Sequence, residues 1–202
     1  STPCFPVKVA HGHVLELIDK GAEAIWLPSV LSMFDDDPST DRNQLCPYVQ
    51  AIPYQVAVAV EPGRKGVKLL QLPVRFGDGP KLLRESLKPL CREFHVSGSR
   101  LDRAIAAALR AQSAFQQDCL ARGRKALVEK PAGQPAVVVI ARPYNGCDPG
   151  VSLDLPNKLR KLGVLPIPID FLPLQSTPIP PRYADMYWRC GQDILAAAAV
   201  VR

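Results

Sequence analysis

Two cysteines, each followed closely by proline, have the clearest chemical potential in this sequence. Cys4 opens the segment CFPVK, and Cys46 opens the segment CPYVQ. Proline is favoured in the first turn of a helix, where its missing N–H needs no partner. Each thiol is therefore expected near a helix start, where the helix dipole stabilises a thiolate or an anionic iron–sulfur cluster. The alternative is that both are ordinary thiols, which pack as small hydrophobic groups.

The remaining cysteines are far apart along the chain and form no compact ligand pattern. Three of them lie in expected helices and are predicted to be packing residues: Cys91, Cys119 and Cys190. Cys147 lies in an expected loop, from which its thiol could reach a metal.

The loop ARPYNGCDPG, residues 141–150, follows an expected strand and is a second candidate site. Ligands of α/β proteins bind at the carboxyl ends of parallel strands. Arg142 is predicted to hold a phosphate or a carboxylate of a cofactor, and Tyr144 to donate a hydrogen bond to it. The alternative is a rigid proline-containing turn in which Asp148 caps the next helix.

Two other clusters suggest metal binding but have simpler explanations. His11 and His13 are two residues apart, so on a helix they face different sides and cannot easily bind one ion. One is expected to pack or cap, and the other to be solvated. Asp35–Asp37 is followed by a proline and has no calcium-loop spacing, so these carboxylates are expected in a solvated loop.

Composition limits the class of protein. The chain has 202 residues, 47% of them apolar, and a net charge of +6. No run of about 20 apolar residues and no secretory signal is present, so the expected location is the cytoplasm, with no membrane partner. The basic residues are dispersed and only 6% of residues are aromatic, so no nucleic-acid partner is expected. The sequence contains no phosphate-binding P-loop, dinucleotide-binding glycine motif or nucleophile elbow.

Hydrophobic periodicity places these motifs on alternating helices and strands. In the first half of the chain, the expected elements are a helix over 6–20, a strand over 24–29 that Pro28 ends, a helix from Pro47, a strand over 67–76, and a helix over 81–96 that Pro89 kinks or divides. In the second half they are a long helix over 97–130 capped by Ser97 or Ser99, a central parallel strand over 136–141, a short helix over 153–163, an edge strand over 164–173, and a final helix over 186–202.

This order predicts an α/β fold with mainly parallel sheets flanked by helices, arranged as two Rossmann-like lobes. The first lobe is expected over 1–96, incomplete at its N-terminal side, and a connecting helix over 97–130. The second lobe is expected over 131–202, incomplete at its C-terminal side. Because the last helix stops at Arg202 without a cap, the chain is expected to be a fragment of a longer protein.

Five blocks, in order, resemble a known family: CFPVKVAHGHV, IWLPS, CPYVQAIP, VVVIARPYNGCDPG and MYWRCGQDIL. The family is the uncharacterised domain joined to CoA-substrate-specific enzyme activases, which is related to 2-hydroxyacyl-CoA dehydratase subunits. The resemblance implies two α/β lobes that hold a [4Fe–4S] cluster through cysteines from separate segments. Cys4 and Cys46 match two of those cysteine positions. Ala141 and Asn145 stand where the family commonly has glycine and histidine.

The resemblance implies ATP-linked, low-potential electron transfer to CoA-thioester chemistry. The implied partners are an ATPase activator domain or subunit and an acyl-CoA, and a homodimer stays open. No catalytic residue is assigned, so whether the chain is itself an enzyme stays open too. One alternative is a non-catalytic module that docks an activase ATPase without a cluster. Another is an acyl-CoA-binding enzyme in which the Arg142 loop holds the nucleotide phosphates.

Overall fold

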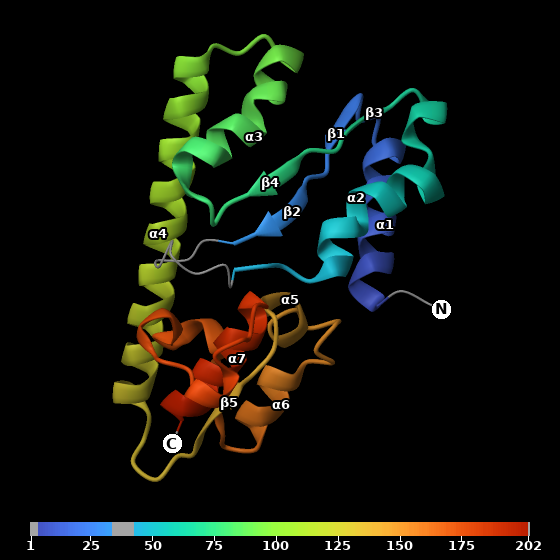
Figure 1. The fold of residues 1–202 in the computed structure, drawn as a ribbon. Helices are drawn as coiled ribbons and strands as arrows, with labels where there is room; N and C mark the ends of the chain where they lie inside the picture. The colour runs from blue at the N-terminus through green and yellow to red at the C-terminus, as the bar shows by residue number, and fades with distance from the viewer. Residues whose placement is uncertain (1–3, 34–42, 202) are drawn as a thin grey trace. The chain divides into compact units, whose positions relative to one another are not determined.

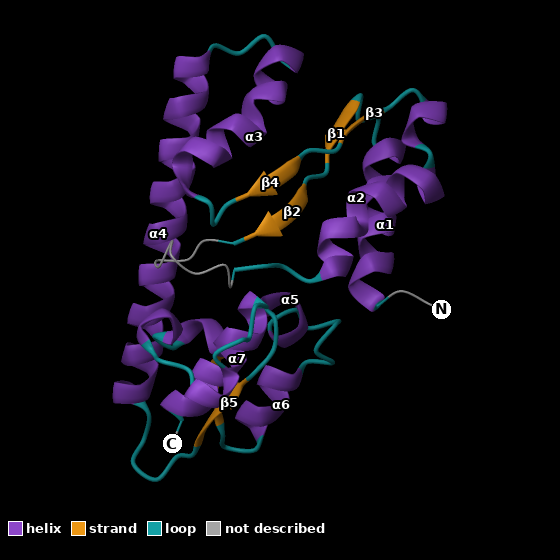
Figure 2. Cartoon of the chain, viewed as in Figure 1, coloured by secondary structure: helices purple, strands orange, loops and turns teal. Residues whose placement is uncertain are grey.

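The computed structural model describes residues 4–33 and 43–201, so the prediction for Asp35–Asp37 lies outside the described residues. The chain divides into two compact units, Ser1–Ile105 and Ala106–Arg202. Both contain short parallel strand pairs with helices, which confirms the predicted α/β class (Figure 2). The predicted limits of the lobes and of the connecting helix stay a prediction.

The first unit alternates helices with short strands (Figure 1). Its elements are α1 (Phe5–Asp19), β1 (Ala24–Trp26), β2 (Ser29–Ser32), α2 (Pro47–Val60), η1 (Pro62–Lys65), β3 (Lys68–Leu70), β4 (Pro73–Arg75), α3 (Gly79–Glu93) and the first part of α4 (Gly98–Glu129). Strand β1 pairs in parallel with β3, and β2 pairs in parallel with β4. Helix α2 therefore lies in the crossover between parallel strands.

Neither strand predicted in this unit is continuous, which corrects the sequence-based prediction: β1 covers only part of 24–29, and β2 begins at Ser29 and extends beyond that range. Pro28 was expected to end the first strand, but it only interrupts it. The backbone N–H of Leu27 donates to Leu70 O at 3.0 Å, and that of Ser29 donates to Leu72 O at 2.8 Å. Since the N–H groups on both sides of Pro28 find acceptors, pairing resumes after the proline. The strand predicted over 67–76 is likewise divided, into β3 and β4.

Four buried aliphatic residues form one core cluster of the first unit: Val14, Ile25, Val56 and Val67. They come from α1, β1, α2 and the residue before β3, so the two helices and the strand pair share one apolar interior.

Helix α3 runs continuously through Pro89, so the predicted division of this helix does not occur. A proline removes one helical hydrogen bond, and here the helix continues for only one further turn before ending at Glu93. Ser97 directly precedes α4, and its Oγ accepts a hydrogen bond from Arg100 N at 3.4 Å. The predicted serine cap is thus present, at the first of the two serines proposed for it.

The second unit contains the rest of α4 and the following elements: β5 (Ala136–Val139), α5 (Pro143–Gly146), α6 (Leu155–Lys161), β6 (Leu165–Pro168), η2 (Ile169–Phe171), η3 (Leu174–Ser176), η4 (Pro181–Tyr183) and α7 (Arg189–Val200). Strands β5 and β6 are parallel. One core cluster of this unit contains four buried residues: Ile167, Ile169, Leu172 and Ala197.

Strand β5 is not the central strand that its apolar run predicted. Among the described residues it pairs with β6 alone, and Val137 is 44% exposed. A run of valines suits a strand buried on both faces, but it also suits a short strand that is covered on one face.

The proline-interrupted strand predicted over 164–173 is present as β6, but it ends at Pro168 and the chain continues as η2. Leu165 N donates to Pro135 O at 2.9 Å, toward the β5 side. Because successive N–H groups alternate sides along a strand, positions 166 and 168 face the other edge, and both are prolines. That edge therefore lacks these two donors, which disfavours the addition of another strand.

No helix in the described parts of the chain is both long and apolar enough to cross a membrane.

Candidate functional site

Cys4 and Cys46 occupy equivalent positions, each as the residue that caps the start of a helix. Their backbones are both extended, with φ and ψ of −61° and 153° at Cys4 and −53° and 133° at Cys46. Cys4 O accepts a hydrogen bond from Val7 N at 3.0 Å, and Cys46 O accepts one from Val49 N at 2.9 Å. Both helices have proline in their first turn. The predicted helix-start position of each thiol is confirmed.

The two helices that carry these cysteines pack against each other. Val14 of α1 and Val56 of α2 belong to one buried cluster. Figure 1 shows α1 and α2 running in roughly the same direction, so their N-terminal ends lie at the same end of the helix pair. The fold therefore directs both helix-start thiols to one end of the first unit.

The start of α2 is anchored on β2. Leu45 N donates to Leu31 O at 3.0 Å, and the hydroxyl of buried Ser29 donates to Gln50 O at 2.7 Å. These bonds fix the residues on both sides of Cys46. The position of this thiol is consequently set by the sheet as well as by its own helix.

The chemistry of this helix end fits two thiolate ligands. Cys4 is exposed and Cys46 is half-buried, so both can be reached from outside the unit. Two thiolates at helix N-termini suit an anionic cluster. Within residues 4–33 and 43–201, however, no group of three or more His, Cys, Asp or Glu side chains is placed to hold a metal ion. A complete ligand set thus requires contributions beyond these two cysteines.

The two nearby histidines, His11 and His13, contact different partners. His11 Nδ1 lies 2.7 Å from Val7 O, and His13 Nδ1 lies 3.7 Å from Glu16 Oε2 with a side chain that is 70% exposed. One histidine bonds to its own helix and the other is solvated, as the sequence indicated.

Arg142 and Tyr144 are brought together in the second unit, after the carboxyl end of β5. Arg142 Nη1 donates to Tyr144 Oη at 3.0 Å, and Arg142 Cζ lies 5.3 Å from the centre of the Trp188 ring. A guanidinium over an indole face is attracted by the ring electrons, so the arginine is held in one orientation.

Trp188 is a member of this cluster that sequence reasoning missed. It lies in the MYWRCGQDIL block, directly before α7. Its Nε1 is buried and has no hydrogen-bond partner among the described residues. The signal available in the sequence was a tryptophan directly before an arginine, but nothing in its spacing linked it to Arg142.

Asp148 caps a turn and not the next helix, which corrects that alternative. Its Oδ1 accepts a hydrogen bond from Val151 N at 2.9 Å, whereas the capping residue of α6 is Asp154. Two residues in the left-handed region, Leu153 and Asp154, separate this turn from the helix. The left-handed backbone at these two residues turns the chain sharply just before α6 begins.

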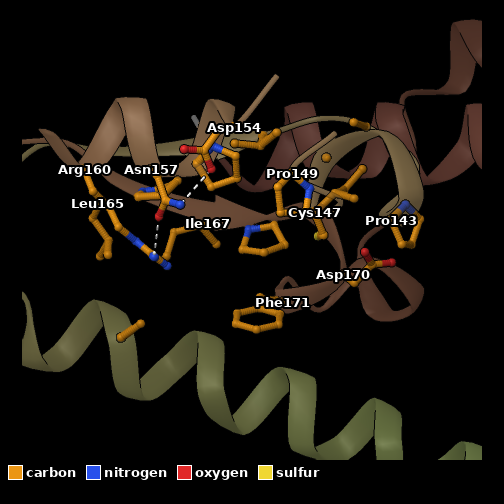
Figure 3. Close-up of a pocket in the computed structure, with 18 residues that line it drawn as sticks. Pro143, Cys147, Pro149, Asp154, Asn157, Arg160, Leu165, Ile167, Asp170 and Phe171 are labelled. Carbon is orange, nitrogen blue, oxygen red and sulfur yellow. Dashed lines mark hydrogen bonds between the residues drawn. The ribbon is translucent and has the colours of Figure 1, made fainter. Parts of the chain in front are cut away.

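A cavity of about 390 Å³ lies beside this loop in the second unit (Figure 3). Most of its wall is apolar, and its polar lining residues are Cys147, Asp154, Asn157, Arg160 and Asp170. Arg142 and Tyr144 do not line it. The sequence places Asp154, Asn157 and Arg160 three residues apart on one helix, a spacing that could have identified a polar face.

Burial shapes the acid–base chemistry of the cavity. Asp170 is exposed over the residue as a whole, yet its carboxyl group is sufficiently desolvated to raise its pKa. Burial also raises the pKa of the Cys147 thiol, and the charge of Asp170 adds to this effect. Both groups therefore favour their protonated forms more than they would in water.

Comparisons with known proteins identify one family. The profile of the family described as the CoA enzyme activase uncharacterised domain matches residues 1–172. Neither a search of curated proteins nor a search of solved structures found a significant match.

Proposed function

Because the chain belongs to the family of the CoA enzyme activase uncharacterised domain, we propose that it is a dehydratase-like domain associated with a [4Fe–4S] cluster. Cys4 and Cys46 are the proposed ligands, and an ATPase activator domain or subunit is the proposed partner. The observation that carries the proposal is the equivalent placement of these two thiols at the starts of two packed helices.

The chain's own contribution is to place two thiols at the starts of packed helices. The first-turn N–H groups of α1 and α2 and the dipoles of both helices favour negative charge beside Cys4 and Cys46. The bonds from Leu45 and Ser29 hold the second helix start on the sheet. When bound, a cluster of this type would supply low-potential electron transfer toward CoA-thioester chemistry.

Iron and acid-labile sulfide analysis of protein prepared without oxygen tests the ligand assignment. Cys4→Ser and Cys46→Ser are each expected to lose most bound iron and sulfide. Cys91→Ser is the matched control, because Cys91 lies in α3 of the same unit and is also partly accessible. Iron content that is unchanged in both test variants would remove Cys4 and Cys46 from the proposal.

A second candidate is a non-catalytic module that docks the activase ATPase without a cluster. It is supported by the lack of a larger ligand group in the described residues and by two exposed aromatics next to the cysteines. Phe5 is 61% exposed and Tyr48 is 46% exposed. In a titration with the cognate ATPase domain, this candidate predicts binding by iron-free protein that Phe5→Ala weakens. No association in either the iron-free or the iron-loaded state would exclude it.

The Arg142 cluster is proposed to bind the phosphate groups of an acyl-CoA. Tyr144 and Trp188 hold the guanidinium in place before a ligand arrives, which lowers the entropic cost of binding. Calorimetry with CoA is expected to show binding that Arg142→Gln weakens more than Arg182→Gln, an arginine of η4 stacked on its own neighbour Tyr183. No heat beyond dilution with the unchanged protein would reject this role.

A further inference from the structure

We propose that the cavity of the second unit binds a small carboxylic acid in its ionised form. In this arrangement Arg160 receives the carboxylate, and the apolar body of the acid lies along β6. The proposal uses none of Cys4, Cys46, Arg142 and Tyr144, so it stands or fails separately from the proposed function.

The size and walls of the cavity suit a compact, mostly apolar ligand. Its volume of about 390 Å³ falls in the range of ordinary small-molecule pockets. Side chains of Val139, Leu165, Ile167 and Phe171 contribute to the lining (Figure 3). Pro166 and Pro168 also line it and have no N–H to offer. A ligand along this wall is therefore favoured by burial of apolar surface more than by hydrogen bonds.

The polar end of the cavity leaves a guanidinium ready for an anion. Arg160 Nη1 donates to Asn157 Oδ1 at 3.2 Å, and no carboxylate among the described residues lies within 4.0 Å of it. Asn157 Nδ2 donates in turn to Asp154 Oδ1 at 2.7 Å. The amide stands between them, so Asp154 forms no direct ion pair with the arginine. A guanidinium has five N–H donors, so several are left for a ligand.

Figure 3 shows the end of the Arg160 side chain reaching into the same space as Leu165 and Ile167. The charge and the apolar wall can thus act on one molecule. An ionised fatty acid of short chain length would complement this site, because its carboxylate would meet the cation and its alkyl chain the aliphatic side chains.

The charges of the lining select the type of anion. The ionisable lining side chains besides Cys147 are one arginine, Arg160, and two carboxylic acids, Asp154 and Asp170. A doubly charged phosphate ester would add two negative charges to a site with a single cation. A carboxylate brings only one charge, so Asp154 and Asp170 repel it less, and its two oxygens can pair directly with the guanidinium fork of Arg160. The site therefore favours a carboxylate over a phosphate ester.

Calorimetric titrations of the whole chain with hexanoate, hexan-1-ol and hexyl phosphate test this inference. Hexanoate is expected to bind more tightly than the other two probes. Arg160→Gln keeps an amide for Asn157 but removes the charge, and it is expected to weaken hexanoate binding at least about tenfold. Arg160→Lys is expected to retain part of the affinity. Arg124→Gln, an exposed arginine of α4 outside the cavity, is the control and should bind like the unchanged protein.

A second variant tests the location independently of charge. Ala126 lines the cavity from α4, so Ala126→Leu fills part of it and is expected to weaken hexanoate and hexan-1-ol together. Thermal melting verifies that each variant is folded. Equal hexanoate affinity in Arg160→Gln and Arg124→Gln, tighter binding of hexyl phosphate than of hexanoate, or no hexanoate binding at millimolar concentration would each overturn the proposal.

Discussion

Individual cysteine residues occupy contrasting environments in this protein. Cys4 is exposed at a helix start, whereas Cys119 is 8% exposed within α4. Burial raises the pKa of the Cys119 thiol, and the charge of Asp170 adds to the effect. Since the thiolate is the form that binds metals, the buried thiol is poorly suited to a ligand role. This agrees with its predicted role as a packing residue.

The reactivity of Cys147 provides a test of its raised pKa. A raised pKa lowers the thiolate fraction at a given pH, so alkylation by iodoacetamide should be slower than for an unperturbed cysteine. Asp170→Asn removes one of the two causes and should speed the reaction modestly. Asp185→Asn, an exposed residue before α7, is the charge-matched control. Mass spectrometry of the Cys147 peptide measures the rates, and equal rates in both variants would contradict the assigned influence of Asp170.

Asp170 should also make stability depend on pH. Burial raises its pKa in the folded state, so the folded chain holds this proton more tightly than the unfolded chain. The stabilising contribution is present below the unfolded pKa and is lost as pH rises through the folded pKa. Asp170→Asn is therefore expected to melt at a higher temperature than the unchanged protein near about pH 8, with the gap closing toward about pH 4. A difference in melting temperature that grows as the pH falls would contradict this prediction.

At the scale of elements, two helical glycines have opposite surroundings. A Cβ atom added at Gly12 of α1 would meet nothing within 4 Å. One added at Gly123 of α4 would lie 2.3 Å from Phe171 O and 2.9 Å from Phe171 Cβ. Helix α4 therefore approaches the backbone of η2 closely, and only glycine permits this contact.

The same substitution at these two positions should change stability in opposite directions. Gly12→Ala is expected to stabilise the protein by about 0.5–1 kcal/mol, because alanine loses less backbone entropy in a helix. Gly123→Ala is expected to destabilise it by about 1–3 kcal/mol through overpacking. Urea unfolding of both variants measures the free energies. Similar values for the two would show that the α4–η2 contact does not constrain the helix.

The sequence predicted the helices better than the strands. Helix starts at Cys4, Cys46 and Ser97 could be located because capping and proline positions are local signals. The breaks within the strand pairs could not, since they depend on which backbone groups face each other after folding. The exposure of Val137 depends in the same way on what covers β5, which its own residues do not specify.

At the scale of the whole molecule, the two units have separate apolar cores. Val56, which is 0% exposed, belongs to the first, and Ile167, which is 2% exposed, belongs to the second. Helix α4 is the segment that runs from one unit into the other. Changes in one core are therefore expected to act mainly on the unit that contains it.

Hydrogen exchange can compare the two cores. Val56→Ala is expected to cost about 1.5–3 kcal/mol and to speed exchange in β1 and β3. Ile167→Val is expected to cost about 0.5–1.5 kcal/mol and to speed exchange in β5 and β6. If Val56→Ala accelerates both strand pairs equally, the chain unfolds as one cooperative body and the two-core description is wrong for its energetics.

Sequence reasoning found part of each candidate site. It placed Cys4 and Cys46 at helix starts and put Arg142 and Tyr144 in one candidate loop, because these motifs are short and local. It missed Trp188 and the cavity with Arg160, since the partners that complete them come from distant segments. Tertiary contacts of this kind leave no fixed spacing in the sequence.

Native mass spectrometry under oxygen-free conditions most directly tests the central claim that Cys4 and Cys46 hold a cluster. The unchanged protein and Cys91→Ser are expected to carry the added mass of four iron and four sulfide ions. The double variant Cys4→Ser with Cys46→Ser is expected to lack it. A cluster retained by the double variant, or no cluster on the unchanged protein after reconstitution with iron and sulfide, would contradict the account.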